Sequence, residues 1–391
     1  MLAKLYTNLE NDFNEMVSIR RYLHQHPELS FQETKTASFI KKYYEKLGIE
    51  VQDRIGGNGV VAKIYGSKPG RTIALRADFD ALPIQDEKDA PYKSLVPGVM
   101  HACGHDGHTA TLLVLAKNLN EMRADLEGTY VMIHQHAEEY APGGAKPMIE
   151  AGCLDGVDAI FGTHLWATVP TGTIQSRVGP IMAAADRFEI TVNGKGGHGA
   201  HPHTSKDAIV TAAQLVVTLQ QIVSRKVNPI DSAVVTVGSF VADNAFNVIA
   251  DKAKLIGTVR TFNENTRAMI EKEIERITKG ICFTNDCGYD YVYERGYPAL
   301  VNHREETEFL MDCAKSVPGV EIVEETEPQM GGEDFAYYLE NLKGSFFFTG
   351  AGSHDAYPHH HPRFDIDERA MLIAARTLAT AAVNYQKKSH D

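Results

Sequence analysis

Histidine, cysteine and carboxylate side chains gather at five places along the chain, and these residue types together bind divalent metal ions. A thiolate, imidazoles and a carboxylate form a donor set that suits a borderline ion. The five places are HACGHDGH at 101–108, Glu138-Glu139, Gly162-Thr163-His164, Gly197-His198 and HHHP at 359–362. The sequence therefore indicates a metal site assembled from distant segments.

Cys103 and His105 alternate within the first of these segments. In an extended backbone, residues i and i+2 point the same way, so both side chains would reach one metal ion. The alternative is a buried, apolar Cys103 beside a polar loop histidine. His164 ends the apolar run AIFGTH, where a histidine is either a ligand or a structural residue.

Glu138 and Glu139 directly follow the apolar run TYVMIHQH. Adjacent carboxylates repel each other when they are partly buried, and a cation that neutralises one of them removes this cost. The other carboxylate then stays near the metal and can accept and donate a proton. The alternative is a pair of exposed loop glutamates.

Asp78 and Asp80 close the run TIALRADFDAL. Carboxylates in such positions can orient a metal-binding imidazole by accepting a hydrogen bond from its second ring nitrogen. They also cap turns, and the sequence leaves the separate roles of the two aspartates open.

His198 lies in the glycine-rich stretch GKGGHG, and Arg260 ends the run LIGTVR. Glycine lets a backbone approach another surface closely, and a histidine held there can donate to a developing oxyanion across a domain or subunit boundary. An arginine can bind a substrate carboxylate. The alternatives are an exposed hairpin histidine and a surface arginine.

Strands and helices alternate in the first part of the chain, which predicts an α/β sheet with parallel strands. Apolar periodicity and stop signals predict helices over Leu9–His26, Glu33–Leu47 and Thr109–Met122. Short β-branched runs predict strands over Gly59–Tyr65, Thr72–Arg76, Thr129–Ile133 and Ala159–His164.

The middle of the chain has a different character, with a β-α-β-β-α-β order over about 182–293. A chain of 391 residues also exceeds what one hydrophobic core usually supports. We therefore predict a discontinuous catalytic domain of residues 1–181 and 294–391, into which a small α+β domain of residues 182–293 is inserted.

Composition excludes several function classes. Lys and Arg number 39 and Asp and Glu 51, a net charge of −12, which argues against a nucleic-acid partner. We find neither a signal peptide nor an apolar run long enough to span a membrane. The chain has only five cysteines, an odd number, which does not indicate a disulfide framework. We therefore expect the protein in the reducing cytoplasm.

Several motifs carry a family resemblance when they are taken together. In chain order they are RADFDALPI, MHACGHDGHTA, Ala137-Glu138-Glu139, GKGGHGAHPH, NVIA with GTVR, GGEDF and HHHPRFDID. They resemble the aminoacylase and glutamate-carboxypeptidase family of dinuclear metallopeptidases. The resemblance is closest to the amidohydrolase branch, which contains hippurate hydrolase, N-acyl-amino-acid amidohydrolases and auxin-conjugate hydrolases.

The resemblance implies an α/β catalytic domain with an inserted lid that often mediates dimerisation, and hence a homodimer or higher oligomer. It implies two divalent ions per subunit, with zinc, manganese, cobalt and nickel all open. The implied activity is cleavage of small N-acyl amino acids to a carboxylic acid and a free amino acid. A dipeptidase, carboxypeptidase or desuccinylase is the nearest alternative.

The resemblance also assigns roles to residues of this chain. Glu138 would act as general base, His198 would stabilise the oxyanion, and Asp80 would assist catalysis. Asn247 and Arg260 would hold the substrate carboxylate. Cys103 would bridge the two ions, and the full ligand set would be Cys103, His105, Glu139, His164 and His360.

Two features depart from the wider family pattern. The first strand motif reads Asp78-Phe79-Asp80 instead of His-x-Asp. The resemblance also implies that Cys103, instead of an aspartate, would be the bridging ligand. His359, His360 and His361 also leave the last ligand ambiguous by one place, and we choose His360 because the branch pattern is His-x-Pro. A cysteine hydrolase with Cys103 as nucleophile, and a metal-binding protein without turnover, are the competing readings.

Overall fold

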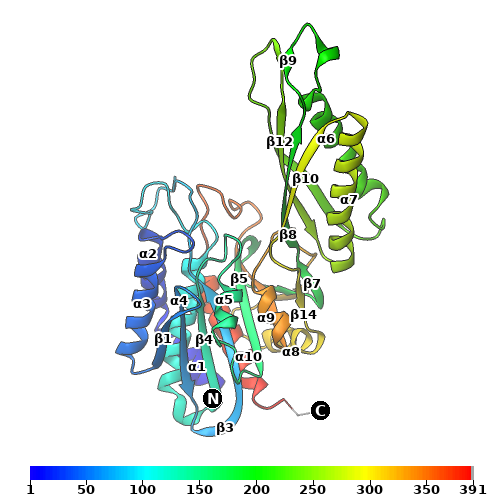
Figure 1. Ribbon diagram of the computed structural model, residues 1–391. Helices are drawn as coiled ribbons and strands as arrows, with labels where there is room; N and C mark the ends of the chain where they lie inside the picture. The colour runs from blue at the N-terminus through cyan, green and yellow to red at the C-terminus, as the bar shows by residue number, and fades with distance from the viewer. Residues whose placement is uncertain (389–391) are drawn as a thin grey trace. The chain divides into compact units, whose positions relative to one another are not determined.

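The computed structural model describes residues 1–388, which form two compact units (Figure 1). The first unit contains residues 1–181, 301–327 and 334 onwards. The second contains residues 182–300 and 328–333. The insertion of one unit into the other therefore begins at Met182, and the short segment 328–333 returns to the second unit after the chain has already left it.

The first unit is built on an eight-stranded mixed sheet with the order β1-β2-β4-β3-β5-β16-β6-β15. Its strands are β1 (Glu50–Ile55), β2 (Gly59–Tyr65), β3 (Lys68–Asp78), β4 (Glu127–Gln135), β5 (Ala159–Pro170), β6 (Thr173–Ser176), β15 (Ile322–Glu325) and β16 (Gly344–Gly352). The central strands β4, β3, β5 and β16 run parallel. Both faces of β4 are almost completely buried, as expected for a parallel strand with cover on both sides.

Helices cover this sheet and bury a large apolar core against it. They are α1 (Leu2–Asn11), α2 (Phe13–Gln25), α3 (Thr34–Lys46), α4 (His105–Glu121), α5 (Ala145–Glu150), α8 (Arg304–Ala314), α9 (Ala336–Asn341) and α10 (Arg369–Tyr385), with a 3-10 turn at Arg123–Asp125. α4 and α10 lie against the central strands and are buried nearly all round. α1 and α2 pack on these two helices from outside.

The second unit is an antiparallel four-stranded sheet with the order β10-β12-β8-β13, covered by two helices. Its elements are β8 (Ala184–Asn193), β9 (Gly197–His198), α6 (Ala208–Arg225), β10 (Ala233–Val241), β11 (Val248–Ile249), β12 (Lys252–Thr261), α7 (Glu264–Thr284) and β13 (Gly288–Arg295), with a 3-10 turn at Pro202–Thr204. β8 alternates strictly between buried and half-buried residues, so one face is covered. The short strands β7 (Gly179–Met182) and β14 (Leu300–Asn302) pair with each other.

Side-chain caps fix where the two long helices of the second unit begin. Asp207 accepts hydrogen bonds from the backbone N–H groups of Ile209 and Val210 at the start of α6. Asn263 does the same for Asn265 and Thr266 at the start of α7. Asp and Asn are preferred at this position because a helix leaves its first N–H groups without partners.

The predicted α/β class is confirmed, and so are most of the predicted elements. The helix expected over Leu9–His26 is wrong in one respect, because α1 ends at Asn11 and α2 begins at Phe13. The extended backbone expected at Cys103–His105 is also wrong. Gly104 has a φ of +92°, and His105 is already the first residue of α4.

Within residues 1–388, α6 is the single helix whose length and apolar composition match those of a membrane span. Its Leu215, Leu219 and Ile222 are fully buried against the sheet of the second unit. A core helix of this kind satisfies the same length and composition test.

A buried ion pair holds β8, α7 and β13 of the second unit together. Arg267 Nε donates to Asp186 Oδ2 at 2.9 Å, and both side chains are almost fully buried. The hydroxyl of Tyr293 and the backbone N–H of Gly296 also donate to Asp186, at 2.8 and 3.1 Å. Removing the carboxylate would leave the Arg267 charge buried without its partner.

We therefore expect Asp186→Ala to lower the free energy of unfolding by about 3–5 kcal/mol, measured by urea unfolding. The matched control is Glu189→Ala on the same strand. Glu189 forms half-exposed pairs with Arg187 and Lys254, so its loss should cost only about 0–1 kcal/mol. Equal losses in the two variants would contradict this account.

Candidate metal centre

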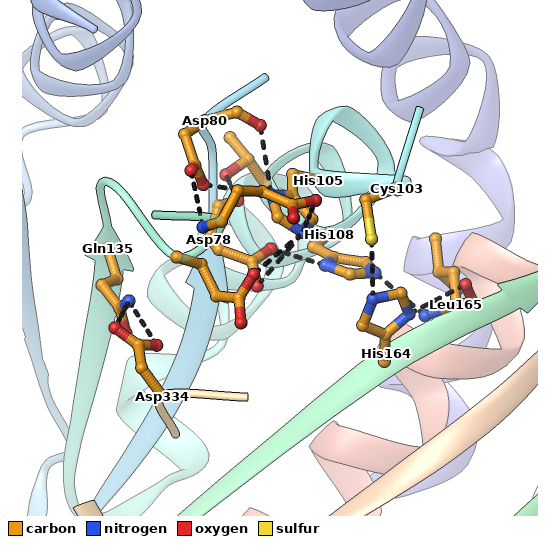
Figure 2. A network of polar contacts seen from close by, with 12 residues as sticks. Asp78, Asp80, Cys103, His105, His108, Gln135, His164, Leu165 and Asp334 are labelled. Carbon is orange, nitrogen blue, oxygen red and sulfur yellow. Dashed lines mark hydrogen bonds and ion pairs between the residues drawn. The ribbon is translucent and has the colours of Figure 1, made fainter. Parts of the chain in front are cut away.

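Three of the predicted ligands, Cys103, His105 and His164, lie together near the ends of β3 and β4 and beside β5 (Figure 2). β3 ends at Asp78, and β4 ends at Gln135, three residues before Glu138. β5 carries His164 two residues beyond its last pairing with β3. Carboxyl ends of parallel strands share one edge of the sheet, and open α/β sheets build their sites there. A loop between β16 and α10 adds His359 and His360.

His105 has its ring oriented by Asp80. Its Nδ1 lies 3.1 Å from both the backbone oxygen and Oδ1 of Asp80, so Nδ1–H donates to them. Nε2 is buried without a hydrogen-bond partner. It lies 4.0 Å from Glu138 Oε2 and 3.9 Å from Glu139 Oε1. This is the arrangement of a metal-binding imidazole whose second nitrogen is held by a carboxylate.

The electrostatic potential at His105 is strongly negative. Burial alone would lower the pKa of His105, but Asp78, Asp80 and Glu139 raise it to about 10. The field that holds a proton on this ring also favours a divalent cation at the same place.

Cys103 and His164 face each other across the cluster. His164 Nδ1 lies 3.0 Å from the backbone oxygen of Leu165, and Nε2 lies 3.4 Å from Cys103 Sγ. Burial, Glu139 and Glu138 raise the pKa of Cys103 well above its usual value. Ionisation of this thiol therefore requires a cation beside it, and a bound metal ion supplies that charge.

Glu139 connects the ligand groups. Its backbone N–H donates to Asp80 Oδ2 at 3.0 Å, and its Oε1 is buried without a hydrogen-bond partner. Oε1 lies 3.2 Å from His360 Nε2. One donor atom each from Cys103, Glu139 and His360 lie within 4.8 Å of one another, as do those of His105, Glu138 and Glu139. Possible metal-ligand atoms thus converge here, and two of them, His105 Nε2 and Glu139 Oε1, are buried without a hydrogen bond. This arrangement fits a metal centre.

The three consecutive histidines have three different environments. His359 Nε2 accepts from the Ala167 N–H at 3.3 Å, and its Nδ1 lies 3.8 Å from Cys103 Sγ. Burial lowers the pKa of His359 to about 3, so the neutral ring carries its proton on Nδ1 and donates toward the sulfur. His360 faces Glu139, whereas His361 stacks on Tyr357. His359 shares a group of possible ligand atoms with Cys103 and His164, and His360 shares another with Cys103 and Glu139.

His108 and Asp78 form a hydrogen-bonded pair beside the ligands. His108 Nδ1–H donates to Asp78 Oδ1 at 2.6 Å, and His108 Nε2 accepts from the Leu165 N–H at 2.9 Å. Both nitrogens of His108 are thereby used within the protein. Burial alone would raise the pKa of Asp78, but the Arg76 guanidinium and the adjacent imidazoles hold it well below its usual value.

Asp78 and Asp80 therefore accept hydrogen bonds from different residues. Asp80 accepts from the His105 ring, from the Glu139 N–H and from the Ser30 hydroxyl at 2.7 Å. Asp78 accepts from His108. Asp80 thus acts on two predicted ligands, which the sequence left undecided.

Arg20 of α2 ties together two segments that carry predicted ligands. It is fully buried and donates to Asp106, the residue after His105, at 2.9 Å. It also donates to Asp365 at 2.7 Å, in the loop that carries His360. Arg20 of α2 therefore fixes these two segments relative to each other.

Sequence reasoning missed several residues that support the cluster. Gln135 Nε2 donates to both carboxylate oxygens of Asp334, at 2.7 and 2.8 Å (Figure 2). The Ala145 N–H donates to Asp334 Oδ2 at 3.0 Å. Burial raises the pKa of Asp334 to about 6. The GGEDF motif carried the signal for Asp334, but its partners lie far away in sequence.

The remaining predicted residues lie in the second unit. His198 is exposed on β9, and it pairs with Val248 of β11, next to Asn247. The Gly199 N–H donates to the Asn247 backbone oxygen at 2.8 Å. Arg260 lies on β12 and donates to Thr258 and to the Val259 backbone oxygen. The unit thus brings His198 and Asn247 together.

Comparison with known proteins identifies the family. The model of peptidase family M20/M25/M40 matches residues 74–384, which is most of the chain. The chain belongs to peptidase family M20/M25/M40. This confirms the family that the motifs resemble, and it makes the protein a hydrolase that acts on amide bonds.

Two relatives of this M20/M25/M40 enzyme cover nearly its whole length, and a third covers about three quarters of it. YhaA of Bacillus subtilis (strain 168) is 64% identical over 382 residues, covering 97% of this chain and 96% of YhaA. Thermostable carboxypeptidase 1 of Saccharolobus solfataricus is 40% identical, covering 98% of this chain and all of that one. An N-acyl-L-amino acid amidohydrolase of Geobacillus stearothermophilus is 48% identical, covering 74% of this chain and 79% of that one.

A solved structure extends the similarity to the fold. The YxeP protein of Bacillus subtilis, described as a dinuclear metal-binding peptidase of the M20 family, has a TM-score of 0.84 and is 38% identical. The match covers 97% of this M20/M25/M40 enzyme and all of YxeP. The predicted two-domain class of the family is thereby confirmed.

The only tryptophan of the chain provides a direct reporter of metal binding. The ring centroid of Trp166 lies 5.2 Å from that of His164 and 4.7 Å from that of His359. We expect addition of Zn²⁺ or Mn²⁺ to chelator-treated protein to change tryptophan emission, because an ion at this cluster alters the charge beside the indole. Cys103→Ser should weaken the apparent affinity about tenfold or more.

The control for this titration is His26→Ala, which removes an exposed histidine that contacts Tyr22. It should titrate like the parent protein. An unchanged metal affinity in Cys103→Ser would exclude the sulfur as a ligand.

Proposed function

We propose that this enzyme is a dinuclear metal amidohydrolase that cleaves N-acyl amino acids to a carboxylic acid and a free amino acid. The observation that carries the proposal is the convergence of buried donor atoms without hydrogen-bond partners, His105 Nε2 and Glu139 Oε1, beside Cys103. The relationship to an N-acyl-L-amino acid amidohydrolase supports the substrate class. N-acetyl and N-benzoyl amino acids are the first substrates to test.

The proposed ligands are the five residues predicted from the motifs. Cys103 would serve both ions, because its sulfur lies in one group of possible ligand atoms with His164 and His359 and in another with Glu139 and His360. His105 completes the set through its Nε2. A thiolate beside imidazoles and carboxylates suits zinc, manganese, cobalt or nickel.

The chemistry that two such ions supply when bound is polarisation of the amide carbonyl and acidification of water. Glu138 is the proposed general base. It takes a proton from the attacking water and passes it to the leaving amine. Glu138 is buried, and its Oε2 lies 4.0 Å from His105 Nε2, so its carboxylate stands beside the ligands without being one of the five.

Asp80 and three residues of the second unit complete the proposal. Asp80 assists catalysis by holding the His105 ring and the Glu139 backbone. His198 is assigned to stabilise the oxyanion, and Asn247 and Arg260 to bind the substrate carboxylate. His198 is exposed on β9, and Asn247 immediately precedes the paired strand β11, which supports the roles of these two residues.

The alternative within the same chemistry is a carboxypeptidase, dipeptidase or desuccinylase. The relationship to a thermostable carboxypeptidase at 40% identity favours testing it. Initial rates on N-acetyl, N-benzoyl and N-succinyl amino acids and on dipeptides distinguish these activities.

We expect Glu138→Gln to lower kcat about 10²- to 10⁴-fold while the metal content stays unchanged. Gln has the shape of Glu but cannot accept a proton, and Glu138 is not among the five ligands. Hydrolysis of the best substrate and metal analysis of the same sample give the two values.

Glu150→Gln, at the exposed end of α5, is the matched control and should retain the parent rate. A chelator should abolish the activity of the parent protein. Activity that survives the chelator would favour a cysteine hydrolase, and near-normal kcat in Glu138→Gln would remove the general base from the proposal.

We also propose a cytoplasmic homodimer that forms through the second unit. All five cysteines are free thiols, which supports a reducing compartment. β10 is an edge strand whose backbone can pair with another chain. Exposed Phe240 and Val241 on β10 and exposed Val210 and Val217 on the adjacent α6 add apolar area.

We expect Val217→Glu to convert the dimer to a monomer, because a buried carboxylate in an apolar interface lacks a partner. Sedimentation velocity measures the mass. Leu95→Glu, at an exposed apolar residue of the first unit, is the control and should leave the mass unchanged. A monomeric parent protein would contradict the proposal.

A further inference from the structure

The segment that delivers Glu138 has an unusual backbone. After β4 ends at Gln135, the chain turns through Ala137, which has a φ of +53°. A residue with a Cβ atom rarely adopts this left-handed conformation, and surrounding contacts must hold it. The turn directs Glu138 and Glu139 toward the cluster, so the groups that hold it also set the position of the base.

Two carboxylates hold the backbone on either side of Glu138. Glu33 Oε1 accepts from the Ala137 N–H at 2.8 Å, and Asp80 Oδ2 accepts from the Glu139 N–H at 3.0 Å. The peptide group between His136 and Ala137 and the peptide group between Glu138 and Glu139 are therefore each held by a buried side chain.

Glu33 is itself held in one position. Its Oε1 also accepts from the Phe31 N–H at 2.9 Å, and its Oε2 accepts from Asn58 Nδ2 at 2.9 Å. The side chain is fully buried. A buried carboxylate needs such donors, and in this case they also determine where its oxygens lie.

The local helix does not explain this carboxylate. Glu33 occupies the residue before α3, but its side chain makes no capping hydrogen bond. Glu28 performs that task, since its Oε2 accepts from the Thr36 N–H at 2.8 Å and from the Thr36 hydroxyl at 2.9 Å. Glu33 instead reaches a loop more than a hundred positions away in sequence.

We propose that Glu33 is a positioning residue that sets the place of the Glu138 carboxylate by accepting the Ala137 N–H. The proposal rests on the function proposed above, with Glu138 as general base. Loss of this hydrogen bond displaces the base relative to the reacting water, whereas the proposed ligand Glu139 stays held through its backbone N–H by Asp80. It therefore lowers kcat and not substrate affinity.

Two variants of Glu33 separate the effect of side-chain length from the effect of the carboxylate group. Glu33→Asp keeps the charge but is too short to reach the Ala137 N–H, so kcat should fall about 10- to 100-fold, with KM changed less than about twofold. Glu33→Gln keeps the length and one acceptor oxygen, and the Asn58 amide can turn its oxygen toward the new NH₂ group. This variant should retain most of kcat.

The matched control is Glu28→Asp, which shortens the glutamate that caps the same helix. It should lower the melting temperature and leave kcat unchanged. Metal content should equal that of the parent protein in all three variants.

Three results would overturn the proposal. They are a normal kcat in Glu33→Asp, a Glu33→Gln variant as slow as Glu33→Asp, and equal losses of kcat in Glu33→Asp and Glu28→Asp. Glu138→Gln is measured alongside. An active Glu138→Gln enzyme overturns the proposed function, whereas an inactive one together with a fully active Glu33→Asp enzyme overturns only the role of Glu33.

Discussion

The concentration of buried negative charge at one edge of the large sheet is the constraint on which the site depends. Asp78, Asp80 and Glu138 are almost fully excluded from water, and Cys103 and Glu139 lie beside them. Burial of so many acidic groups is unfavourable unless cations compensate them. Arg76 supplies one positive charge within the protein. The negative charge that remains uncompensated favours the binding of divalent ions. Buried atoms without a hydrogen-bond partner, His105 Nε2 and Glu139 Oε1, are available to bind them.

The hydrogen bonds around the site decide which nitrogen of each imidazole is available. His105 and His164 give their Nδ1 protons to oxygen acceptors and turn Nε2 to the cluster. His108 uses both nitrogens within the protein. His105 and His108, which lie in one short segment, therefore differ in whether a ring nitrogen is free to bind a metal ion. Their hydrogen bonds to backbone groups and to side chains both determine this difference.

The sequence predicted the fold class and the ligand segments because local patterns encode both. Apolar periodicity located β2, β5 and α3, and motif order located Cys103, Glu139 and His360. The turn at Gly104 was missed because alternation of Cys103 and His105 suits a strand equally well. Glu33 was missed because its partner is a backbone N–H group, which has no signature in the sequence. The His-x-Pro pattern was the basis for choosing His360, and both His359 and His360 lie near Cys103 in the structure.

The order of the donors along the chain has a consequence for biosynthesis. Cys103, Glu139 and His164 precede the second unit, whereas His360 follows it. Arg20 must also wait for Asp365 before it can join the two halves of the first unit. A ribosome therefore finishes the inserted unit before the last donor emerges from the exit tunnel. With the ligand set proposed above, stable metal uptake would be a late event, after nearly the whole polypeptide has been released for folding.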